Sequence, residues 1–390
     1  MRATKCKWIE DNKVSKILIS ANSGWNIVNF RAALIADLLS CGYEVEVLVP
    51  ADSYAPEIRE LGVSLHFMRM TATGMRPWRE LLAIYDISRT VLAVRPDLLL
   101  NFTVKPNLYS SLVAALLRIP SIATITGIGR AIMGGAMSRR LILLLYRIAG
   151  MSRFSHFVFQ NDVDRALFVD RKIVKTHATT LIRGSGVDVD KFRPRADRPN
   201  TTAVTFVFVG RIMREKGIRE FVSAAQAVYA SEPAVSFAAI GSFESPSEGP
   251  HQLPGWLGSG IDGAVRFHGH VTDVHHFMSN ADCVVLPSYR EGLSRSLLEA
   301  AAMAKPIITT NVPGCRDIVS DGINGFLCAP QSAASLEHAI RRFLRLSSEE
   351  RAAMGMEGRR LVEKYFSNEI ITREYVELVK TQLSRRAVRP

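Results

Sequence analysis

Short apolar runs that alternate with helical patterns, twice along the chain, constrain its fold more than any other feature. The run at residues 16–20 leads into a Gly- and Asn-containing turn, a helical pattern at 28–40 and a second apolar run at 43–49. The same order begins again at residues 205–209. Strands that alternate with helices form open parallel sheets. We therefore expect an α/β protein with two doubly wound, Rossmann-like domains.

The pattern continues through both halves, which suits two domains in 390 residues. We expect further strands at residues 64–69, 97–102, 121–126, 157–160, 180–182, 235–240, 264–268, 283–286 and 306–310. We expect further helices at 78–94, 106–117, 217–230, 273–279, 293–303, 334–345, 348–366 and 368–384. An Arg- and Pro-rich segment at 193–200 separates the halves. The expected domains are 1–195 and 196–366, with a helix in 367–390 that crosses back to the first.

Composition excludes several classes of protein. Hydrophobic residues make up 47% and charged residues 22%, which excludes a disordered chain. The five cysteines have no paired spacing, so we expect neither a disulfide framework nor a zinc site, and we expect no metal at all. No apolar run is long enough for a spanning helix, and the N-terminus does not have the pattern of a signal peptide.

Residues 287–299 contain the most informative candidate site. An apolar strand at 283–286 runs into a loop that opens a helix near Leu293. The backbone N–H groups of a first helical turn have no helical acceptor and suit a phosphate. Gly292 allows a close approach, Glu291 projects from the loop, and Glu299 lies two turns further on, where it can accept from the vicinal hydroxyls of a sugar. The alternative is a capping Glu291 and a solvated Glu299.

A second candidate site is the loop at residues 210–217, which also follows a strand and precedes a helix. Arg211 and Lys216 can neutralise a diphosphate, Arg through paired donors and Lys as a point charge. The loop is not a P-loop, because no GK[ST] sequence follows. The alternative is a solvated basic turn.

These two segments, in this order, resemble the retaining nucleotide-sugar glycosyltransferases of family four, which have the two-domain GT-B fold and a "glycosyl transferases group 1" domain. Residues 207–217 resemble the family's FVGRxxxxKG motif, and residues 281–299 resemble its motif ending in LEA. Similar matches occur at residues 185–188, 305–321 and 324–327. The resemblance extends over residues 16–380.

The resemblance implies roles for the candidate residues and a central cleft between the two domains. Glu299 would hold the ribose hydroxyls, Arg211 and Lys216 the diphosphate, and Glu291 the donor sugar. The N–H groups of Gly292, Leu293 and Ser294 would complete the phosphate site. Catalysis would rest on Glu291, Lys216 and Arg211, with no cofactor and no metal. We expect a UDP-linked N-acetylhexosamine or hexose as donor.

The first half resembles a bacterial subgroup that adds sugars to lipid-diphosphate-linked acceptors in O-antigen, capsule, exopolysaccharide or glycan-precursor assembly. The segments concerned are residues 29–31, 102–106, 124–129 and 159–162. Many family members carry a His after the strand at 122–126, where this chain has Thr126 and Gly127. Lys105 and Asn161 are therefore candidate sugar or acceptor contacts, as is Thr126. His156, His268 and His270 are better explained as structural residues.

The first loop, residues 22–26, follows the first strand and faces the expected cleft. Gly24 can let the loop pass close to the donor diphosphate. Trp25 can form an apolar platform for a sugar or lipid. The alternative is a plain strand–helix turn with Trp25 packed inside.

Positive charge is concentrated in the first half. The net charge of +12 divides into 27 Lys and Arg against 16 Asp and Glu in residues 1–195, and 22 against 21 in the rest. Residues 138–153 combine an apolar stripe of Leu141, Leu144, Leu145 and Ile148 with Arg139, Arg140 and Arg147. Such a helix can lie on an anionic bilayer; the alternative is a helix that faces the core. We expect a cytoplasmic protein attached to the inner face of the cytoplasmic membrane.

Other functions remain open from the sequence. A sugar-nucleotide 2-epimerase has the same fold, and so does a non-catalytic sugar-nucleotide-binding protein. A phosphorylase would be longer and would hold a cofactor lysine, and neither feature is evident. Nucleic-acid binding is disfavoured, because the basic residues are not interleaved with aromatic ones.

Overall fold

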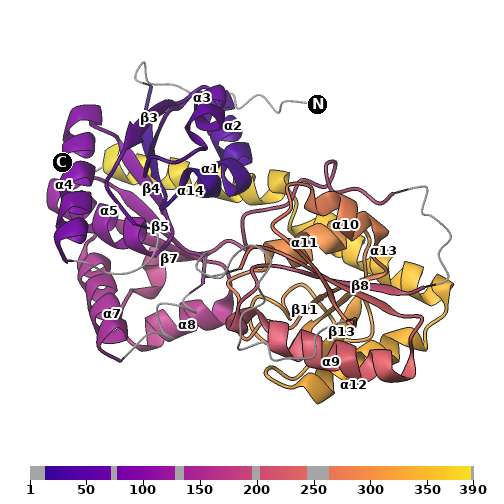
Figure 1. The fold of residues 1–390 in the computed structure, drawn as a ribbon. Coiled ribbons are helices and arrows are strands. Elements are labelled where there is room, and N and C mark those ends of the chain that lie inside the picture. Colours follow the sequence, from indigo (N-terminus) through magenta and orange to yellow (C-terminus); the bar gives the residue numbers. More distant parts are fainter. Residues whose placement is uncertain (1–13, 72–76, 128–135, 196–202, 244–262, 388–390) are drawn as a thin grey trace. The chain divides into compact units, whose positions relative to one another are not determined.

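The computed structural model describes residues 14–71, 77–127, 136–195, 203–243 and 263–387 (Figure 1). The chain divides into two compact units, residues 1–185 with 368–390 and residues 186–367. Residues 186–195, which the sequence grouped with the first domain, belong to the second unit. The reason is packing: Val187 donates its N–H to the carbonyl of Phe366 at 3.0 Å, and Phe192 lies in the second unit's core.

The first unit is a seven-stranded parallel sheet covered by helices on both faces (Figure 1). The strand order is β3-β2-β1-β4-β5-β6-β7, so the order reverses between β1 and β4. Its elements are β1 (Lys16–Ser20), α1 (Gly24–Phe30), α2 (Ala32–Ser40), β2 (Glu44–Val49), α3 (Ala55–Glu60), β3 (Ser64–Phe67), α4 (Pro77–Val94), β4 (Leu98–Phe102), α5 (Val104–Leu117), β5 (Ser121–Ile125), α7 (Ala136–Met151), β6 (Ser155–Phe159), α8 (Asp162–Asp170), β7 (Thr179–Leu181) and α14 (Asn368–Ala387).

Alternation along the strands creates two cores, one on each face of this sheet. Ile17 and Ile19 pack with α1, α2, α3 and α14, whereas Leu18 packs with α4, α5, α7 and α8. Strands buried on both faces read as continuous apolar runs, which is why the sequence located β1 at residues 16–20. The C-terminal helix α14 packs against α2, and Tyr375 is fully enclosed in the core of this unit.

The second unit is a six-stranded parallel sheet in the order β10-β9-β8-β11-β12-β13 (Figure 1). A single continuous core surrounds it. Its elements are β8 (Thr205–Val209), α9 (Ile218–Ser231), β9 (Ser236–Ile240), β10 (Arg266–Gly269), α10 (Val274–Asn280), β11 (Cys283–Leu286), α11 (Arg295–Ala302), β12 (Ile307–Thr310), β13 (Gly325–Cys328), α12 (Ala333–Leu344) and α13 (Ser348–Tyr365).

The structure differs from the sequence-based elements at a few places. The helix expected at 28–40 is two helices that meet at Arg31, whose buried guanidinium lies 3.7 Å from the centre of the Phe102 ring. The helices α3 and α8 and the strand β13 were not expected. The expected strand at 264–268 lies at Arg266–Gly269. Part of the expected linker, 196–200, lies outside the described residues.

Within the described segments, every helix is either too short or too polar to cross a bilayer.

Two glycines of α13 differ sharply in the space around them. A Cβ at Gly355 would lie 1.9 Å from the carbonyl oxygen of Ala304, whereas at Gly358 the nearest atom is the Cβ of Ala301 at 3.5 Å. The backbone of the turn after α11 thus approaches α13 directly at Gly355. Only the absence of a side chain at that position permits this contact.

We predict opposite effects of alanine at these two positions. Gly355→Ala forces backbone apart and should lower the free energy of unfolding by about 1–3 kcal/mol. Gly358→Ala makes only ordinary contact and should gain about 0.5–1 kcal/mol from helix propensity. Urea unfolding followed by circular dichroism measures both, and equal midpoints for the two variants would contradict the close approach.

Candidate functional site

The carboxyl edge of the second sheet brings the two candidate loops into direct contact. Gly217 ends the loop after β8 with a φ of 74°, and a Cβ there would lie 2.0 Å from the carbonyl oxygen of Pro287, the first residue after β11. The N–H of Tyr289 donates to the carbonyl of Glu215 at 2.9 Å. Because β8 and β11 are neighbours, their loops emerge side by side, and Gly217 lets the backbones touch.

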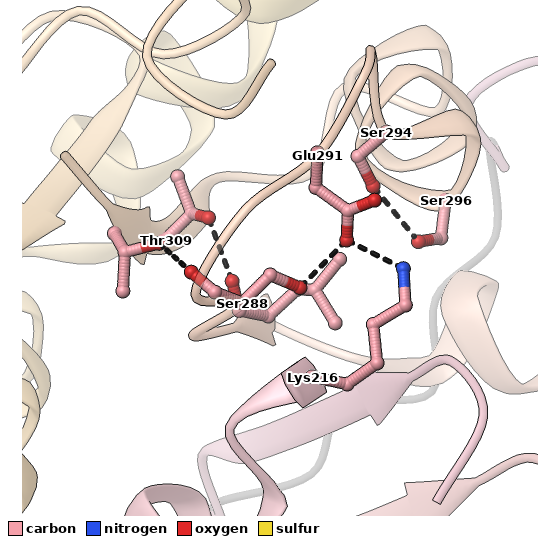
Figure 2. Close-up of polar contacts among 8 residues, drawn as sticks. Lys216, Ser288, Glu291, Ser294, Ser296 and Thr309 are labelled. Atoms are coloured by element: carbon pink, nitrogen blue, oxygen red, sulfur yellow. Dashed lines mark hydrogen bonds and ion pairs between the residues drawn. The ribbon is translucent and has the colours of Figure 1, made fainter. Parts of the chain in front are cut away.

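Lys216 and Glu291 meet where these loops touch. The Nζ of Lys216 lies 2.5 Å from the Oε1 of Glu291, and the side chains are 20% and 12% exposed (Figure 2). Ser288 donates its hydroxyl to the same carboxylate oxygen at 2.7 Å. The two catalytic candidates thus form a largely buried ion pair.

Hydrogen bonds to strand ends hold the Ser288 loop in place. Thr309 donates its hydroxyl to the carbonyl of Leu286 at 2.6 Å, and Thr310 donates to the carbonyl of Ser288 (Figure 2). Burial and the nearby Glu291 carboxylate raise the pKa of the Cys315 thiol to about 12, so this thiol is protonated at neutral pH. Ser288 and Thr310 were not among the residues predicted from the sequence, although Thr310 ends β12 and Ser288 follows β11 by two residues.

The first turn of α11 lies beside this pair. The helix begins at Arg295, two residues later than expected from the sequence. The N–H of Ser294 donates to the carbonyl of Gly314 at 3.2 Å, and a Cβ at Gly314 would lie 2.6 Å from the carbonyl oxygen of Gly292. In this conformation the N–H of Ser294 is therefore used within the protein. The N–H groups of residues 295–297 are the ones without a helical acceptor.

Glu299 lies one turn further along α11 and is 17% exposed. Arg295 donates from Nε to its Oε1 at 2.9 Å. Burial raises the pKa of the Glu299 carboxyl, while the positive charges of Arg295 and Lys191 oppose the rise. The carboxylate is thus a partly enclosed acceptor on the helix that opens beside Lys216 and Glu291.

Arg211 and Leu293 complete the candidates of the second unit. Arg211 directly follows Gly210 at the end of β8 and is exposed. Leu293 is partly buried and packs against the core of the unit. The loops at the carboxyl edge therefore place an exposed guanidinium, a largely buried ammonium and a helix N-terminus on one edge of one sheet.

In the first unit, Gly24 opens α1 and its N–H already has an acidic partner. It donates to the Oδ2 of Asp52 at 2.6 Å, and a Cβ at Gly24 would lie 2.4 Å from the other carboxylate oxygen of Asp52. Trp25 is 45% exposed and meets Phe30 edge to face, with ring centres 4.9 Å apart. The alternative of an internally packed Trp25 is therefore wrong. The sequence did not indicate the hydrogen bond by which Asp52 holds the loop at Gly24.

Lys105 forms a buried network just after β4. Its Nζ lies 2.8 Å from the Oε1 of Glu80, and Tyr109 donates its hydroxyl to the other oxygen of Glu80 at 2.8 Å. Thr103, which precedes Lys105, has a φ of 72°. A non-glycine residue in this region is strained. The backbone strain lies at the carboxyl edge of the first sheet.

Asn161 caps a helix, and Thr126 lies in a loop. The Oδ1 of Asn161 accepts from the N–H of Asp164 at 2.8 Å and so caps α8. Thr126 is half-buried just after β5, and Gly129 of the same motif lies outside the described residues. The ring of His156 is buried and bonds the hydroxyl of Thr180 at 2.8 Å. His268 and His270 are exposed at the edge strand β10.

The basic helix expected at 138–153 is α7 (Ala136–Met151). Leu141, Leu144 and Ile148 are exposed, whereas Leu145 packs against the core. Arg140 and Arg147 are exposed, and the side chain of Arg139 lies outside the described residues. Most of the expected apolar stripe therefore faces outward.

Two Rossmann-like units with parallel sheets define the GT-B class of glycosyltransferase folds. Residues 27–184 match the family described as glycosyl transferase 4-like domain, and residues 190–361 match the family described as glycosyl transferases group 1. The chain belongs to the glycosyltransferases built from these two domains.

Individual relatives agree with this assignment. An N,N'-diacetylbacillosaminyl-diphospho-undecaprenol alpha-1,3-N-acetylgalactosaminyltransferase of Campylobacter jejuni is 25% identical over 342 residues, 83% of this chain and 88% of that protein. The capsular polysaccharide glycosyltransferase CapM of Staphylococcus aureus is 32% identical over 45% of this chain and 46% of its own length. HepE of Anabaena, solved in complex with UDP and glucose, shares the fold with a TM-score of 0.76 at 18% identity, over 94% of this chain and 100% of HepE.

We predict that the cations of the β8 loop stabilise the transition state of transfer. Lys216→Ala and Arg211→Ala should each lower turnover at least tenfold, a loss of about 1.4 kcal/mol. Arg219→Ala removes an exposed guanidinium at the start of α9 and is the control. Steady-state kinetics of the purified variants measure the effect, and wild-type turnover in Lys216→Ala would refute the assigned role.

We predict that Glu299 recognises the donor's ribose. Glu299→Ala should raise the KM for the donor and should remove the preference for a ribose over a 2′-deoxyribose donor. The matched control is Glu337→Ala, because Glu337 forms an ion pair with Arg341 at the same 2.9 Å on α12. If the Glu299→Ala enzyme prefers the ribose donor over the 2′-deoxyribose donor as strongly as wild type does, Glu299 has no role in recognising the ribose.

Proposed function

We propose that this glycosyltransferase moves a sugar from a nucleotide-diphosphate sugar to a lipid-diphosphate-linked saccharide in the assembly of bacterial surface polysaccharide or of a glycan precursor. The proposed donor is a UDP-linked N-acetylhexosamine or hexose. Transfer proceeds with retention of configuration and without a metal ion. The Campylobacter relative, whose name describes a diphospho-undecaprenol acceptor, supports the acceptor class. The UDP and glucose bound to HepE support the donor class.

The observation that carries the proposal is the Lys216–Glu291 pair beside the first turn of α11. A departing nucleoside diphosphate develops negative charge on its phosphate oxygens. A lysine ammonium, the exposed Arg211 and the positive end of the α11 dipole all counter that charge. The loops that carry Lys216 and Glu291 are held by hydrogen bonds at strand ends before the donor binds, which limits the reorganisation that accompanies the reaction.

Glu291 and Glu299 have different roles in this proposal. Glu291 shares its Oε1 with Lys216 and Ser288, so its Oε2 is the oxygen that can accept from a sugar hydroxyl. Glu299 lies one turn into the helix that follows the Glu291 loop and accepts from the ribose. Glu291 thus binds the sugar end of the donor and Glu299 binds the ribose end. Lys216 and Arg211 lie at the diphosphate between the two ends.

The first unit supplies the acceptor side of the proposal. Its carboxyl edge holds buried polar atoms with no hydrogen-bond partner in the described residues: the Oδ1 of Asn26, the Nδ2 of Asn101 and the Oγ1 of Thr103. Buried polar atoms are ordinarily paired. A saccharide hydroxyl or a diphosphate oxygen can satisfy such atoms, and Trp25 offers an exposed aromatic face nearby in sequence.

The same unit has a surface suited to an anionic bilayer. On α7 the side chains of Leu141, Leu144 and Ile148 are exposed among Arg140 and Arg147. The helix α4 lies on the same side of the sheet, with α5 between it and α7 (Figure 1). Its exposed side chains include Trp78, Leu81, Tyr85 and Leu92, together with Arg79 and Arg89. The helical spacing of these apolar residues could have predicted an exposed apolar face on α4 from the sequence.

A panel of radiolabelled nucleotide sugars, each incubated with lipid-diphosphate-linked saccharides, tests the proposal. Transfer of label from one UDP-sugar to the organic phase is the expected result, and UDP should raise the melting temperature. Conversion of the nucleotide sugar without any acceptor would instead establish an epimerase. UDP binding with no turnover on the whole panel would establish a binding protein.

We predict that the basic face of α7 attaches the protein to anionic membranes. Wild-type protein should sediment with vesicles rich in phosphatidylglycerol at low salt and be partly released at high salt, because exposed charges are screened beyond about 10 Å. The change Arg139→Glu, Arg140→Glu and Arg147→Glu should abolish sedimentation but leave transfer to a short-tailed, soluble acceptor intact.

The matched control carries the same number of charge reversals on the second unit, at the exposed residues Arg219, Arg345 and Arg360. Its sedimentation should remain close to that of wild type. Undiminished sedimentation of the α7 variant would mean that this helix does not mediate attachment.

A further inference from the structure

A cavity of about 380 Å³ lies at the amino edge of the first sheet. Its walls include Pro120, Phe154 and Ala178, which come just before β5, β6 and β7. The candidate acceptor residues of this unit follow the carboxyl ends of its strands instead. The cavity is therefore separate from the site described above, and nothing in the proposed transfer reaction uses it.

The cavity is lined by cations. Arg118, Arg153, Lys175 and Arg385 all contribute to its walls, together with two histidines and no acidic side chain among the described lining residues. None of these four cations forms an ion pair with a carboxylate in the described part of the chain. Burial, with the neighbouring charges of Arg385 and His177, lowers the pKa of His156 to about 4. Positive charge thus gathers here without an internal counter-ion.

Two buried polar side chains in the cavity wall lack partners. Gln382 is 9% exposed and Ser155 is 5% exposed. The Nε2 of Gln382 and the Oγ of Ser155 make no hydrogen bond in the described residues. Both can donate to an oxyanion, and leaving such donors unpaired in the interior costs about 1–3 kcal/mol each. The wall therefore combines solvated cations at the rim with unused donors further in.

The cavity adjoins a second, shallow groove whose walls are partly basic and partly apolar. A second hollow of about 510 Å³ shares Arg118, Arg153 and Phe154 with the first and is also lined by Ile148 and Met151. Ile148 and Met151 are 47% and 73% exposed, and both belong to α7. These two side chains continue the outward apolar face of that helix. A ligand that fills both hollows has an anionic group at one end and an apolar part at the other.

We propose that this cavity and groove bind an anionic glycerophospholipid, with the headgroup phosphate between Arg118, Arg153, Lys175 and Gln382 and an acyl chain along Ile148 and Met151. The choice of a lipid as the source of the phosphate rests on the membrane attachment proposed above. The binding of a phosphate group in the cavity does not depend on that attachment. The site would anchor one particular lipid, in addition to the general attraction between α7 and the bilayer.

Short-chain lipid below its micellar concentration tests the site directly. Dihexanoyl phosphatidylglycerol should bind the wild-type protein at least tenfold more tightly than inorganic phosphate does, measured by titration calorimetry, because only the lipid reaches the groove. Equal affinity for the two ligands would show that the site takes free phosphate, and would overturn the lipid assignment. No binding of either ligand would overturn the site itself.

Two variants separate the cavity from general electrostatics. Arg153→Gln with Lys175→Gln should weaken dihexanoyl phosphatidylglycerol at least tenfold. The control Arg59→Gln with Arg373→Gln removes two exposed cations elsewhere on the same unit and should change affinity less than twofold. Gln382→Leu leaves the net charge unchanged and should weaken the lipid at least threefold without lowering the melting temperature. Unchanged affinity in both cavity variants would refute the proposal.

Vesicle sedimentation distinguishes this proposal from the attachment through α7. Vesicles of phosphatidylcholine with phosphatidylglycerol are compared with vesicles that carry equal negative charge as cholesteryl hemisuccinate. The cavity variants should lose the preference for phosphatidylglycerol but still sediment with both. The α7 variant should lose all sedimentation but should still bind dihexanoyl phosphatidylglycerol. That result would show that the cavity still binds lipid and that α7 makes the contact with the bilayer.

Discussion

The backbone contact between the loops after β8 and β11 is the constraint on which the candidate site depends. Gly217 has a positive φ and no Cβ, so the carbonyl of Pro287 occupies the space where a side chain would lie. That contact sets Lys216 opposite Glu291 although 75 residues separate them along the chain. A larger residue at position 217 would push the loops apart. The ion pair would then be lost although neither Lys216 nor Glu291 had been changed.

The ion pair has a physical consequence for ligand binding. Taking an ammonium and a carboxylate out of water is costly, and their attraction offsets the cost only when further hydrogen bonds satisfy the remaining atoms. Ser288 supplies one such bond to Glu291. If the donor binds as proposed, its diphosphate offers Lys216 a second anionic partner, which leaves the Oε1 of Glu291 free to accept from a sugar hydroxyl. Donor binding and the positioning of Glu291 would then be coupled through one ammonium group.

The sequence predicted buried parallel strands well and tertiary contacts poorly, for a physical reason. The strands at 205–209 and 283–286 agree at both ends with the structure, because strands buried on both faces are continuous apolar runs that Gly or Pro terminates. The break at Arg31 depends on a guanidinium stacked over Phe102, which lies far away in sequence. The strand β13 begins with Gly325, and glycine is depleted in strands, so the segment did not indicate a strand.

The same distinction applies to the site residues. Parallel topology places every loop after a strand at one edge, so the sequence could bring Lys216, Glu291 and Glu299 to the same region. It could not predict that Lys105 pairs with Glu80 on α4 or that Asn161 caps α8, because those partners follow from side-chain packing.

The cation-rich cavity could not be predicted from the sequence either. Its walls come from residues 118 to 385, which meet only when α14 packs on the rest of the first unit. Charge counted along the chain indicated that the first half is basic, but only the fold divides that charge between an outer helix face and the rim of a cavity. The two locations differ in physical effect, because charge on the helix face is screened by salt, whereas charge around a cavity with buried, unused donors can select one anionic group over another.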